Sequence, residues 1–156
     1  TTQHVLAALY NLITQAPCMP QRVLDVGTGS GILAIAAAKW GVPYVCATDT
    51  DAHAVEVARQ NAQQNHVSVN CTHQPLTAIS SPPYNIVLAN ILAPVLCTLM
   101  PHLSQALVPG GALVLSGIAK PQWQSIQAAL HTHGLVARRV LCDDMWLTVV
   151  CHAPTH

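Results

Sequence analysis

The stretch VLDVGTGSG, residues 23–31, decides the fold, because a short apolar strand pattern runs directly into a loop with glycine at positions 27, 29 and 31. Glycine lets the backbone turn sharply and approach a ligand closely, and the N-terminus of the apolar helix that follows offers free N–H donors. A dinucleotide fingerprint, G-x-G-x-x-G, would place a glycine where this sequence has Ile32. A purely structural tight turn is the alternative interpretation of these glycines. The position of the glycine-rich segment between a strand and a helix favours a ligand-binding loop.

Strand and helix patterns alternate along the rest of the chain. The apolar spacing predicts helices at residues 4–13, 32–40, 51–65, 94–107 and 121–133, and strands at residues 22–26, 44–48, 67–72, 86–89, 112–117, 135–142 and 145–152. A turn at PGG, residues 109–111, precedes the fifth strand, and Asp143 and Asp144 join the last two strands as a hairpin.

Near-continuous apolar strands that alternate with helices are typical of a parallel sheet covered on both faces. We therefore expect one α/β domain over residues 1–156. Its expected architecture is a Rossmann-like doubly wound sheet of seven strands, mostly parallel, with an antiparallel strand in the C-terminal hairpin.

The composition narrows the class of protein. Hydrophobic residues make up 51% of the chain and charged residues 8%, against about 25% charged in typical soluble domains. The formal net charge is zero, so no basic face predicts direct binding of nucleic acid or of an anionic membrane. The sequence has neither an apolar run long enough to span a membrane nor a signal-peptide pattern.

The six cysteines and nine histidines do not predict a metal site. No two cysteines have the close spacing of a zinc knuckle or a redox dithiol, and several lie in apolar runs, where a free cysteine behaves as a small hydrophobe. His131 and His133 point to different sides of a helix. We expect a reduced, cytoplasmic protein without a metal.

Polar side chains end the second and fourth predicted strands, at the sheet edge where ligands bind in this class of fold. Asp49 follows Gly27 by 22 positions, which suits an acid that accepts hydrogen bonds from ribose hydroxyls. Asp51 is better placed to cap the next helix. Asp25 either organises the amides of the glycine loop or is purely structural.

Asn90 ends the fourth strand within IVLANILAP, residues 86–94, and therefore faces the expected ligand crevice. A helix-capping asparagine is the alternative interpretation. The segment SPPYN, residues 81–85, looks more like an amine-methylation motif, but it precedes the strand and lies at the wrong edge of the sheet. We interpret it as a proline-rich turn.

These segments carry a family resemblance. VLDVGTGSGILAIAAAKWG, ATDTDAHAVEVARQNA, NILAP and LVPGGALVLSGI together resemble the class I S-adenosylmethionine-dependent methyltransferases. More narrowly, they resemble the ribosomal-protein methyltransferase family (PrmA) that modifies protein L-eleven of the large subunit. The similarity runs from Thr1 to the strand that contains Trp146, and NILA with LSGI is its most particular part.

The resemblance implies S-adenosylmethionine as cofactor, S-adenosylhomocysteine as product and a ribosomal protein as substrate. The family's glycine loop falls on Gly27, Gly29 and Gly31 and holds the methionine part of the cofactor, while its ribose acid falls on Asp49. Its N-x-x-A asparagine falls on Asn90, which the resemblance implies to be a cofactor-binding residue beside the sulfonium.

The family's THPTT segment also touches the cofactor, and its last two letters fall on Thr1 and Thr2. The resemblance therefore implies a cofactor contact at Thr2. In the loop after the third strand, Pro75 has no N–H for an adenine ring, so an adenine contact there would rely on the amide of Leu76 or the side chain of Gln74.

The resemblance also has departures. The family's N-terminal substrate-recognition domain is absent from the sequence, which begins inside the threonine motif. The alternatives are therefore a cofactor-binding fragment that is inactive without that domain, a methyltransferase for another protein or a small-molecule amine, and a nicotinamide-dependent oxidoreductase. The loop spacing and NILAP count against the oxidoreductase. The oligomeric state is not predicted.

Methyl transfer from a sulfonium is an in-line displacement, so positioning contributes most to the rate. We expect Asn90 Oδ1 to accept a hydrogen bond from the incoming amine, a lysine side chain or an α-amine, and to aim its lone pair at the methyl group. No histidine or carboxylate in the sequence is placed as the base, which leaves water as the expected proton acceptor.

Overall fold

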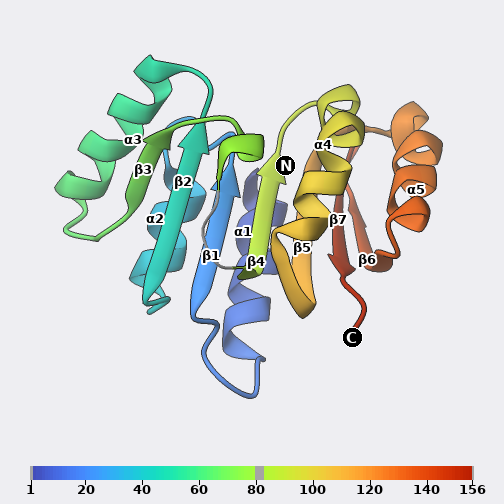
Figure 1. The fold of residues 1–156 in the computed structure, drawn as a ribbon, viewed down its shortest axis with the longest axis horizontal. Helices are drawn as coiled ribbons and strands as arrows, with labels where there is room; N and C mark the ends of the chain where they lie inside the picture. Colours follow the sequence, from blue (N-terminus) through green and yellow to red (C-terminus); the bar gives the residue numbers. More distant parts are fainter. Residues whose placement is uncertain (1, 80–82, 156) are drawn as a thin grey trace.

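The computed structural model describes residues 2–79 and 83–155, which form seven strands, five helices and two short 3₁₀ turns (Figure 1). The helices are α1 (Thr2–Thr14), α2 (Ile32–Lys39), α3 (Ala52–Gln64), α4 (Ala93–Gln105) and α5 (Trp123–Thr132), and the 3₁₀ turns are η1 (Leu76–Ala78) and η2 (Lys120–Gln122). The strands are β1 (Arg22–Val26), β2 (Tyr44–Asp49), β3 (Asn70–His73), β4 (Tyr84–Asn90), β5 (Leu107–Ala119), β6 (Val136–Cys142) and β7 (Trp146–His152).

The seven strands form one sheet in the order β3-β2-β1-β4-β5-β7-β6. Strands β1 to β5 are parallel to their neighbours among themselves, and β7 is antiparallel to both β5 and β6. The strand order reverses between β1 and β4, which is where doubly wound sheets bind ligands. The fold class predicted from the sequence is confirmed, including the antiparallel C-terminal strand.

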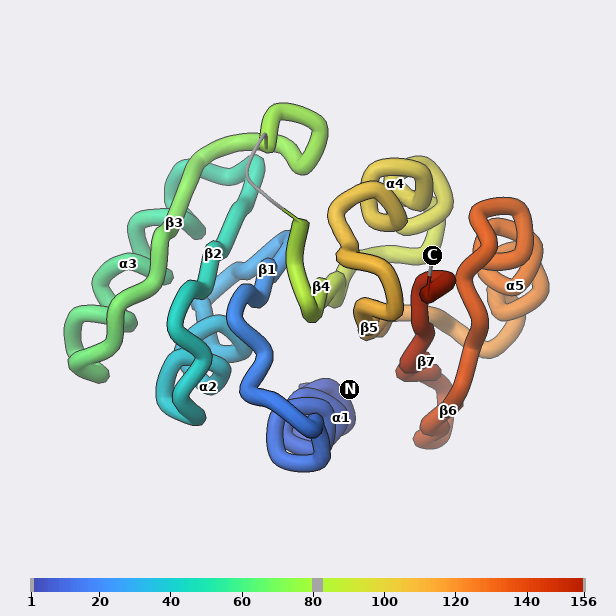
Figure 2. Tube along the Cα trace, turned by 60° about the horizontal axis from the view of Figure 1, so that its bottom comes forward, coloured from blue at the N-terminus to red at the C-terminus, as the bar shows by residue number. Residues whose placement is uncertain are grey.

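Helices cover both faces of the sheet. Helices α1, α2 and α3 bury their apolar sides on one face, and α4 and α5 cover the other (Figure 2). The strands between them are nearly continuous runs of buried apolar residues, such as Val23 and Leu24 of β1, which point to opposite faces. This two-sided burial explains why the strand sequences are apolar throughout instead of alternating.

Helix α1 brings the start of the chain to the edge where the parallel strands end. Its C-terminus leads into the amino end of β1, so α1 runs antiparallel to the strands and its first turn lies toward their carboxyl ends (Figure 1). The helix packs beside β4 and β5. This orientation places Thr2 at the same edge as Asn90.

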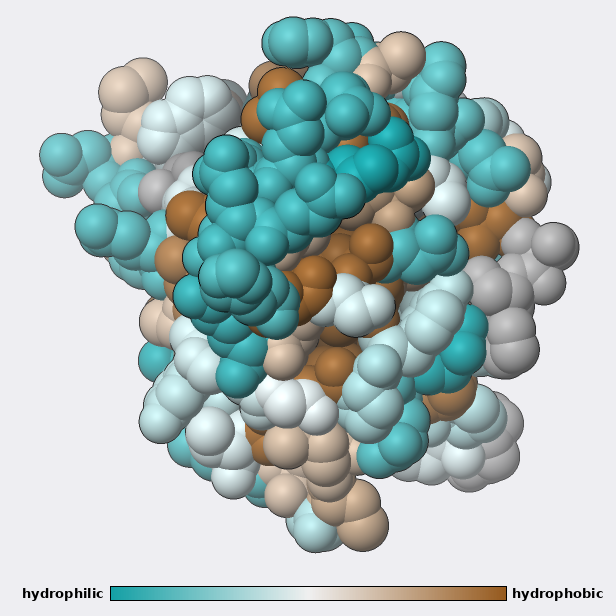
Figure 3. Space-filling view, turned by 90° about the vertical axis from the view of Figure 1, so that its left-hand side faces the viewer, coloured by the Kyte–Doolittle hydropathy of each residue, from teal (hydrophilic) through white to brown (hydrophobic). Residues whose placement is uncertain are grey.

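The outer side of α3 is polar, as an amphipathic helix on the sheet requires. Figure 3 shows a largely hydrophilic surface on this side of the molecule. The helix begins after Asp51, whose carboxylate accepts a hydrogen bond from the amide of His53 at 2.9 Å, so the predicted cap is confirmed. Glu56 and Arg59 form an exposed ion pair at 2.8 Å.

Among the helices that the structure describes, none combines the length and the hydrophobicity of a membrane-spanning helix.

The predicted turn at PGG is wrong, because these residues lie inside β5. Tyr84 of β4 pairs with Leu107, but the next pair is Ile86 with Ala112, so residues 108–111 bulge out of the ladder. A glycine-rich segment can bend in this way without leaving the sheet, because a bulge needs unusual backbone angles that glycine supplies.

The beginning of β4 also differs from the sequence prediction. Tyr84 and Asn85 are strand residues and not part of a proline-rich turn, while residues 81–82 of that motif lie outside the described residues. Tyr84 and Asn85 are nevertheless at the amino end of β4, so this described part of the motif lies at the edge opposite Asn90, as predicted. The third strand is shorter than predicted and covers only residues 70–73.

Candidate functional site

The carboxyl ends of β1, β2 and β4 bring the glycine loop, Asp49 and Asn90 to one edge of the sheet. Backbone hydrogen bonds fix the loop against β2, because Thr48 O accepts from the amides of Gly27 at 2.9 Å and Thr28 at 3.0 Å. The sequence therefore located this edge correctly.

The three glycines of the loop all have positive φ, but they meet different surroundings. A Cβ on Gly27 would lie 2.5 Å from the Ile91 Cγ2 atom, and one on Gly31 would lie 3.0 Å from the Cβ of Ala58 in α3. A Cβ on Gly29 would have no neighbour within 4 Å. Gly31 thus lets α2 approach α3, while Gly29 borders open space.

Asp49 braces this open loop. Its Oδ2 atom accepts a hydrogen bond from the Gly29 amide at 3.0 Å, and its Oδ1 atom accepts one from the Asp51 amide at 2.9 Å. A carboxylate has about four acceptor positions, so each oxygen keeps capacity for a ribose hydroxyl. The side chain joins the two elements that would enclose a cofactor, which agrees with the predicted role without testing it.

Asp25 lies fully buried directly beneath the loop. Its Oδ2 atom accepts a hydrogen bond from the Thr28 hydroxyl at 2.7 Å. Burial raises the pKa of this carboxyl to about 7, although the hydrogen bonds from the Thr28 hydroxyl and the Ala34 backbone oppose the shift and the charge of Asp49 adds to it. Asp25 therefore organises the loop through the Thr28 hydroxyl.

Asp25→Asn is expected to remove a pH dependence of stability between about pH 4 and about pH 7. In this window the folded protein keeps a proton on Asp25 that the unfolded chain has released, so the free energy of unfolding of the parent falls as pH rises. The fall ends near pH 7, where the folded carboxyl also ionises, and it is on the order of a few kcal/mol.

Urea denaturation at both ends of this window measures the effect. Asp51→Asn, which changes an exposed cap on the same edge, is the matched control and should keep the pH dependence of the parent. An Asp25→Asn protein whose stability falls with pH as steeply as that of the parent would show that another group titrates.

Asn90 is the last residue of β4 and is partly exposed at this edge. Its side chain makes no hydrogen bond to any residue that the structure describes, so its amide is free to meet a ligand. The helix-capping alternative is wrong, because α4 begins after Leu92 and has no side-chain cap. Asn90 pairs with Ser116 of β5, and the residue that follows it is also closely packed.

Ile91 lies between two glycines from neighbouring strands. Its side chain packs where a Cβ of Gly27 would be, and its carbonyl oxygen lies 2.6 Å from the position of a Cβ on Gly117 in β5. Gly117 also has a φ of +80°, which L side chains rarely adopt. The backbone directly after Asn90 is therefore fixed between the glycine loop and β5.

The sequence interpretation did not assign roles to Ile91 and Gly117. The sequence does contain a signal for Gly117, because a glycine inside an otherwise apolar strand often marks the close approach of another backbone. The segments NILA and LSGI, which carry the most particular part of the family resemblance, are the two segments that meet at this contact.

The loop after β3 is positioned by Thr48, whose hydroxyl donates a hydrogen bond to the carbonyl of Gln74. Leu76 is the first residue of η1, so its N–H is not used within that turn. The position of Leu76 agrees with the predicted adenine contact. That contact and the cofactor contact at Thr2 both stay predictions.

The cysteines include buried and exposed thiols. Cys46, Cys71 and Cys151 are buried, and burial raises their pKa, in Cys151 to about 12. They are small hydrophobes, as predicted, whereas Cys18 and Cys142 are exposed.

In the described part of the chain, no group of three or more His, Cys, Asp or Glu residues is arranged to hold a metal ion.

Comparisons with known proteins agree with the resemblance. The family model for ribosomal protein L11 methyltransferase (PrmA) matches residues 1–154. The ribosomal protein L11 methyltransferase of Syntrophotalea carbinolica is 44% identical over 148 residues, which are 94% of this chain and 48% of the relative. That of Rhodopseudomonas palustris is 40% identical and covers 96% of this chain and 52% of the relative. The chain thus spans about half the length of the curated relatives it matches.

Solved structures show the same fold. The ribosomal protein L11 methylase from Lactobacillus delbrueckii subsp. bulgaricus superposes with a TM-score of 0.88 at 32% identity, over 98% of this chain and 78% of the other. Magnesium protoporphyrin IX methyltransferase from Synechocystis PCC 6803, solved with bound SAM, shares the fold at a TM-score of 0.80 and 20% identity, over 97% of this chain and 78% of the other. The family model and the identities together show that this chain belongs to the ribosomal protein L11 methyltransferase (PrmA) family.

Proposed function

We propose that the chain binds S-adenosylmethionine at the carboxyl edge of its sheet and transfers a methyl group to an amine of a ribosomal protein. The names of its relatives state a ribosomal protein substrate for those proteins. The product would be S-adenosylhomocysteine, and a ribosomal substrate implies a cytoplasmic location. The observation that carries the proposal is the open space over Gly29, bordered by a carboxylate that already holds the loop.

The residues at this edge fit the cofactor. The empty Cβ position of Gly29 leaves room for the methionine part, and Gly27 and Gly31 give the loop its shape. Asp49 offers carboxylate oxygens to ribose hydroxyls, and the N–H of Leu76 can meet the adenine ring. Thr2, at the same edge on α1, would be a further contact.

S-adenosylmethionine, when bound, supplies an electrophilic methyl group on a sulfonium. The chain's part is to orient the acceptor: Asn90 Oδ1 accepts a hydrogen bond from the amine and directs its lone pair toward the bound cofactor. A lysine ε-amine has a pKa of about 10.4, so it must lose a proton before it can react. We assign that proton to water.

Isothermal titration calorimetry with S-adenosylhomocysteine tests the binding half of the proposal. The expected result is a single site for S-adenosylhomocysteine and no binding of NAD. Asp49→Ala should weaken binding at least about tenfold, because it removes both the ribose partner and the support of the Gly29 amide. The matched control is Glu56→Ala on the exposed side of α3, which should bind like the parent. Binding of NAD in place of S-adenosylhomocysteine would contradict the proposal.

A second candidate is favoured by the coverage of the relatives. Because the chain matches about half of their length, a chain that binds the cofactor without turnover is the main alternative. Transfer of a labelled methyl group to purified ribosomal protein L11 separates the two, measured with and without the separately expressed N-terminal half of a relative. Turnover by the chain alone supports the proposal. Turnover only with the added half supports the second candidate, and transfer only to another amine would replace the substrate.

A further inference from the structure

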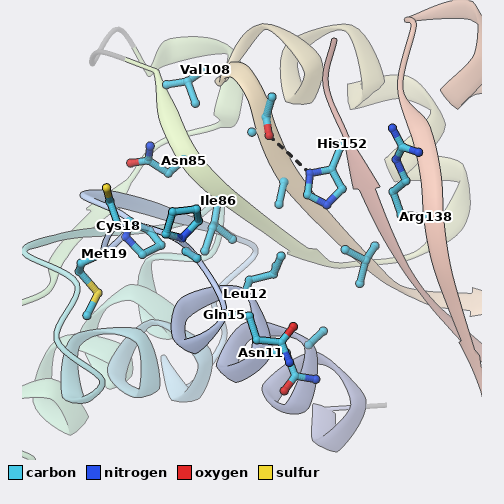
Figure 4. A pocket seen from close by; sticks show the side chains of 18 of the residues that line it. Asn11, Leu12, Gln15, Cys18, Met19, Asn85, Ile86, Val108, Arg138 and His152 are labelled. Carbon is cyan, nitrogen blue, oxygen red and sulfur yellow. Dashed lines mark hydrogen bonds between the residues drawn. The ribbon is translucent and has the colours of Figure 1, made fainter. Parts of the chain in front are cut away.

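A concave site lies at the opposite edge of the sheet, away from the glycine loop. It is a groove of ≈ 800 Å³ between the end of α1, the loop of residues 15–21, the bulge of β5 and the β6–β7 hairpin. Figure 4 shows Asn11 and Gln15 on one wall, His152 in the middle and Arg138 on the far side. All these elements meet where β4 begins, so the groove does not share residues with the proposed cofactor site.

The groove carries unpaired positive charge. Arg138 and Arg139 both line it, and neither forms an ion pair or a hydrogen bond with any residue in the described ranges. His152 lies beside them and has a polar contact of 3.4 Å from Nδ1 to the carbonyl oxygen of Gly110. Two guanidinium groups without acidic partners form a local excess of positive charge in a chain whose net charge is zero.

The acidic residues of the chain are all elsewhere. None of the six lines the groove, since they lie at the glycine-loop edge, on α3 and in the turn before β7: Asp25, Asp49, Asp51, Glu56, Asp143 and Asp144. A negative group in the groove would therefore meet two arginines and no repelling carboxylate. The segregation of charge between the two edges predicts an anionic ligand.

The size and the walls restrict the kind of anion. Small-molecule sites have volumes of about 300–1,000 Å³ and are mostly apolar with a few convergent polar groups. This groove fits that description, because apolar side chains such as Leu12, Met19 and Val108 form much of its lining. A nucleic-acid backbone would need a longer row of cations than two arginines and one histidine.

We propose that this groove binds a small amphipathic anion, with a carboxylate or phosphate head on the arginines and an apolar body along the walls. The planar guanidinium group suits both heads, because it donates two parallel hydrogen bonds to a carboxylate or a phosphate. The site is independent of methyl transfer, since it shares no residue with the carboxyl edge.

Octanoate is a suitable probe, and NMR titration of the ¹⁵N-labelled full chain measures its binding. Octanoate should bind, 1-octanol should bind more weakly, and octyl phosphate shows which head is preferred. Arg138→Gln combined with Arg139→Gln should weaken octanoate binding about tenfold. Lys120→Gln, a cation at the other edge, should bind octanoate like the parent. Circular dichroism of each variant checks that it is folded.

Cys18 provides an internal reporter, because this exposed thiol lines the groove. Saturating octanoate should slow its alkylation by iodoacetamide several-fold, while Cys142, exposed at the opposite edge, should react at an unchanged rate. Equal protection of both thiols, equal affinity for octanol and octanoate, or unaltered binding in the double arginine variant would each overturn the proposal. Displacement of octanoate by a short RNA would assign the groove to nucleic acid instead.

Discussion

Gly117→Ala is expected to reduce methyl transfer about a hundredfold, although Gly117 is placed to touch neither cofactor nor substrate. The new Cβ would lie 2.6 Å from the carbonyl oxygen of Ile91, which backbone atoms cannot tolerate, so the segment after Asn90 must move. A displacement of about 1 Å in a positioning group costs about this much in rate. The expected signature is a large fall in kcat with a smaller change in the affinity for S-adenosylhomocysteine.

Gly134→Ala is the matched control, because it places alanine at the same kind of positive φ without a clash. Gly134 has φ +70° and its nearest neighbour would be 3.6 Å away, an ordinary contact. It should lower the free energy of unfolding by about 1 kcal/mol from backbone strain alone, whereas Gly117→Ala should lower it by about 3 kcal/mol. Equal losses of stability and unchanged turnover in both variants would contradict the role of Gly117.

A double-mutant cycle separates the two glycines that enclose Ile91. A Cβ on Gly27 would clash with the side chain of Ile91, but one on Gly117 would clash with its backbone. Ile91→Ala should therefore reduce the loss of stability that Gly27→Ala causes, with a coupling energy of about 1 kcal/mol in urea denaturation. It should not reduce the loss of stability that Gly117→Ala causes. Relief of both or of neither would mean that Ile91 is not held as we describe.

Asn90→Ala is expected to reduce methyl transfer about a hundredfold or more, while weakening cofactor binding far less and leaving stability close to that of the parent. The side chain makes no hydrogen bond within the described residues, so its removal costs little folding energy. Its proposed hydrogen bond to the amine serves only to orient the reacting group. Calorimetry with S-adenosylhomocysteine and a methylation assay, with the N-terminal half of a relative added where turnover requires it, measure the two quantities.

The opposite end of the same strand provides the matched control. Asn85 Oδ1 accepts hydrogen bonds from the backbone amides of Gln21 and Arg22, both at 2.9 Å, so Asn85→Ala leaves two donors without this partner. It should lower the free energy of unfolding by about 1–3 kcal/mol and leave the kinetics of the folded protein unchanged. A large stability loss in Asn90→Ala, or turnover equal to that of the parent, would remove Asn90 from the mechanism.

Much of the proposed site could be predicted from the sequence because its signals are local. Glycine spacing, the aspartate that ends β2 and the asparagine that ends β4 can be found in short segments, and the topological rule then places them on one edge. The errors were local as well. The glycines of PGG suggested a turn, but the strand continues through a bulge, because pairing with β4 on one side and β7 on the other holds both of its ends in the sheet.

The sequence by itself determined the order of strands and helices, the edge of the sheet where we propose that the cofactor binds and the residues that reach this edge, because apolar periodicity and glycine are properties of neighbours along the chain. Only the tertiary structure decided how Ile91 is held between Gly27 and Gly117, why Asp25 stays buried beneath the loop, and where unpaired arginines meet an acid-free groove. These features join segments that are far apart in sequence. Their contacts exist only once the helices pack on the sheet, since close packing fixes distances that no local pattern encodes.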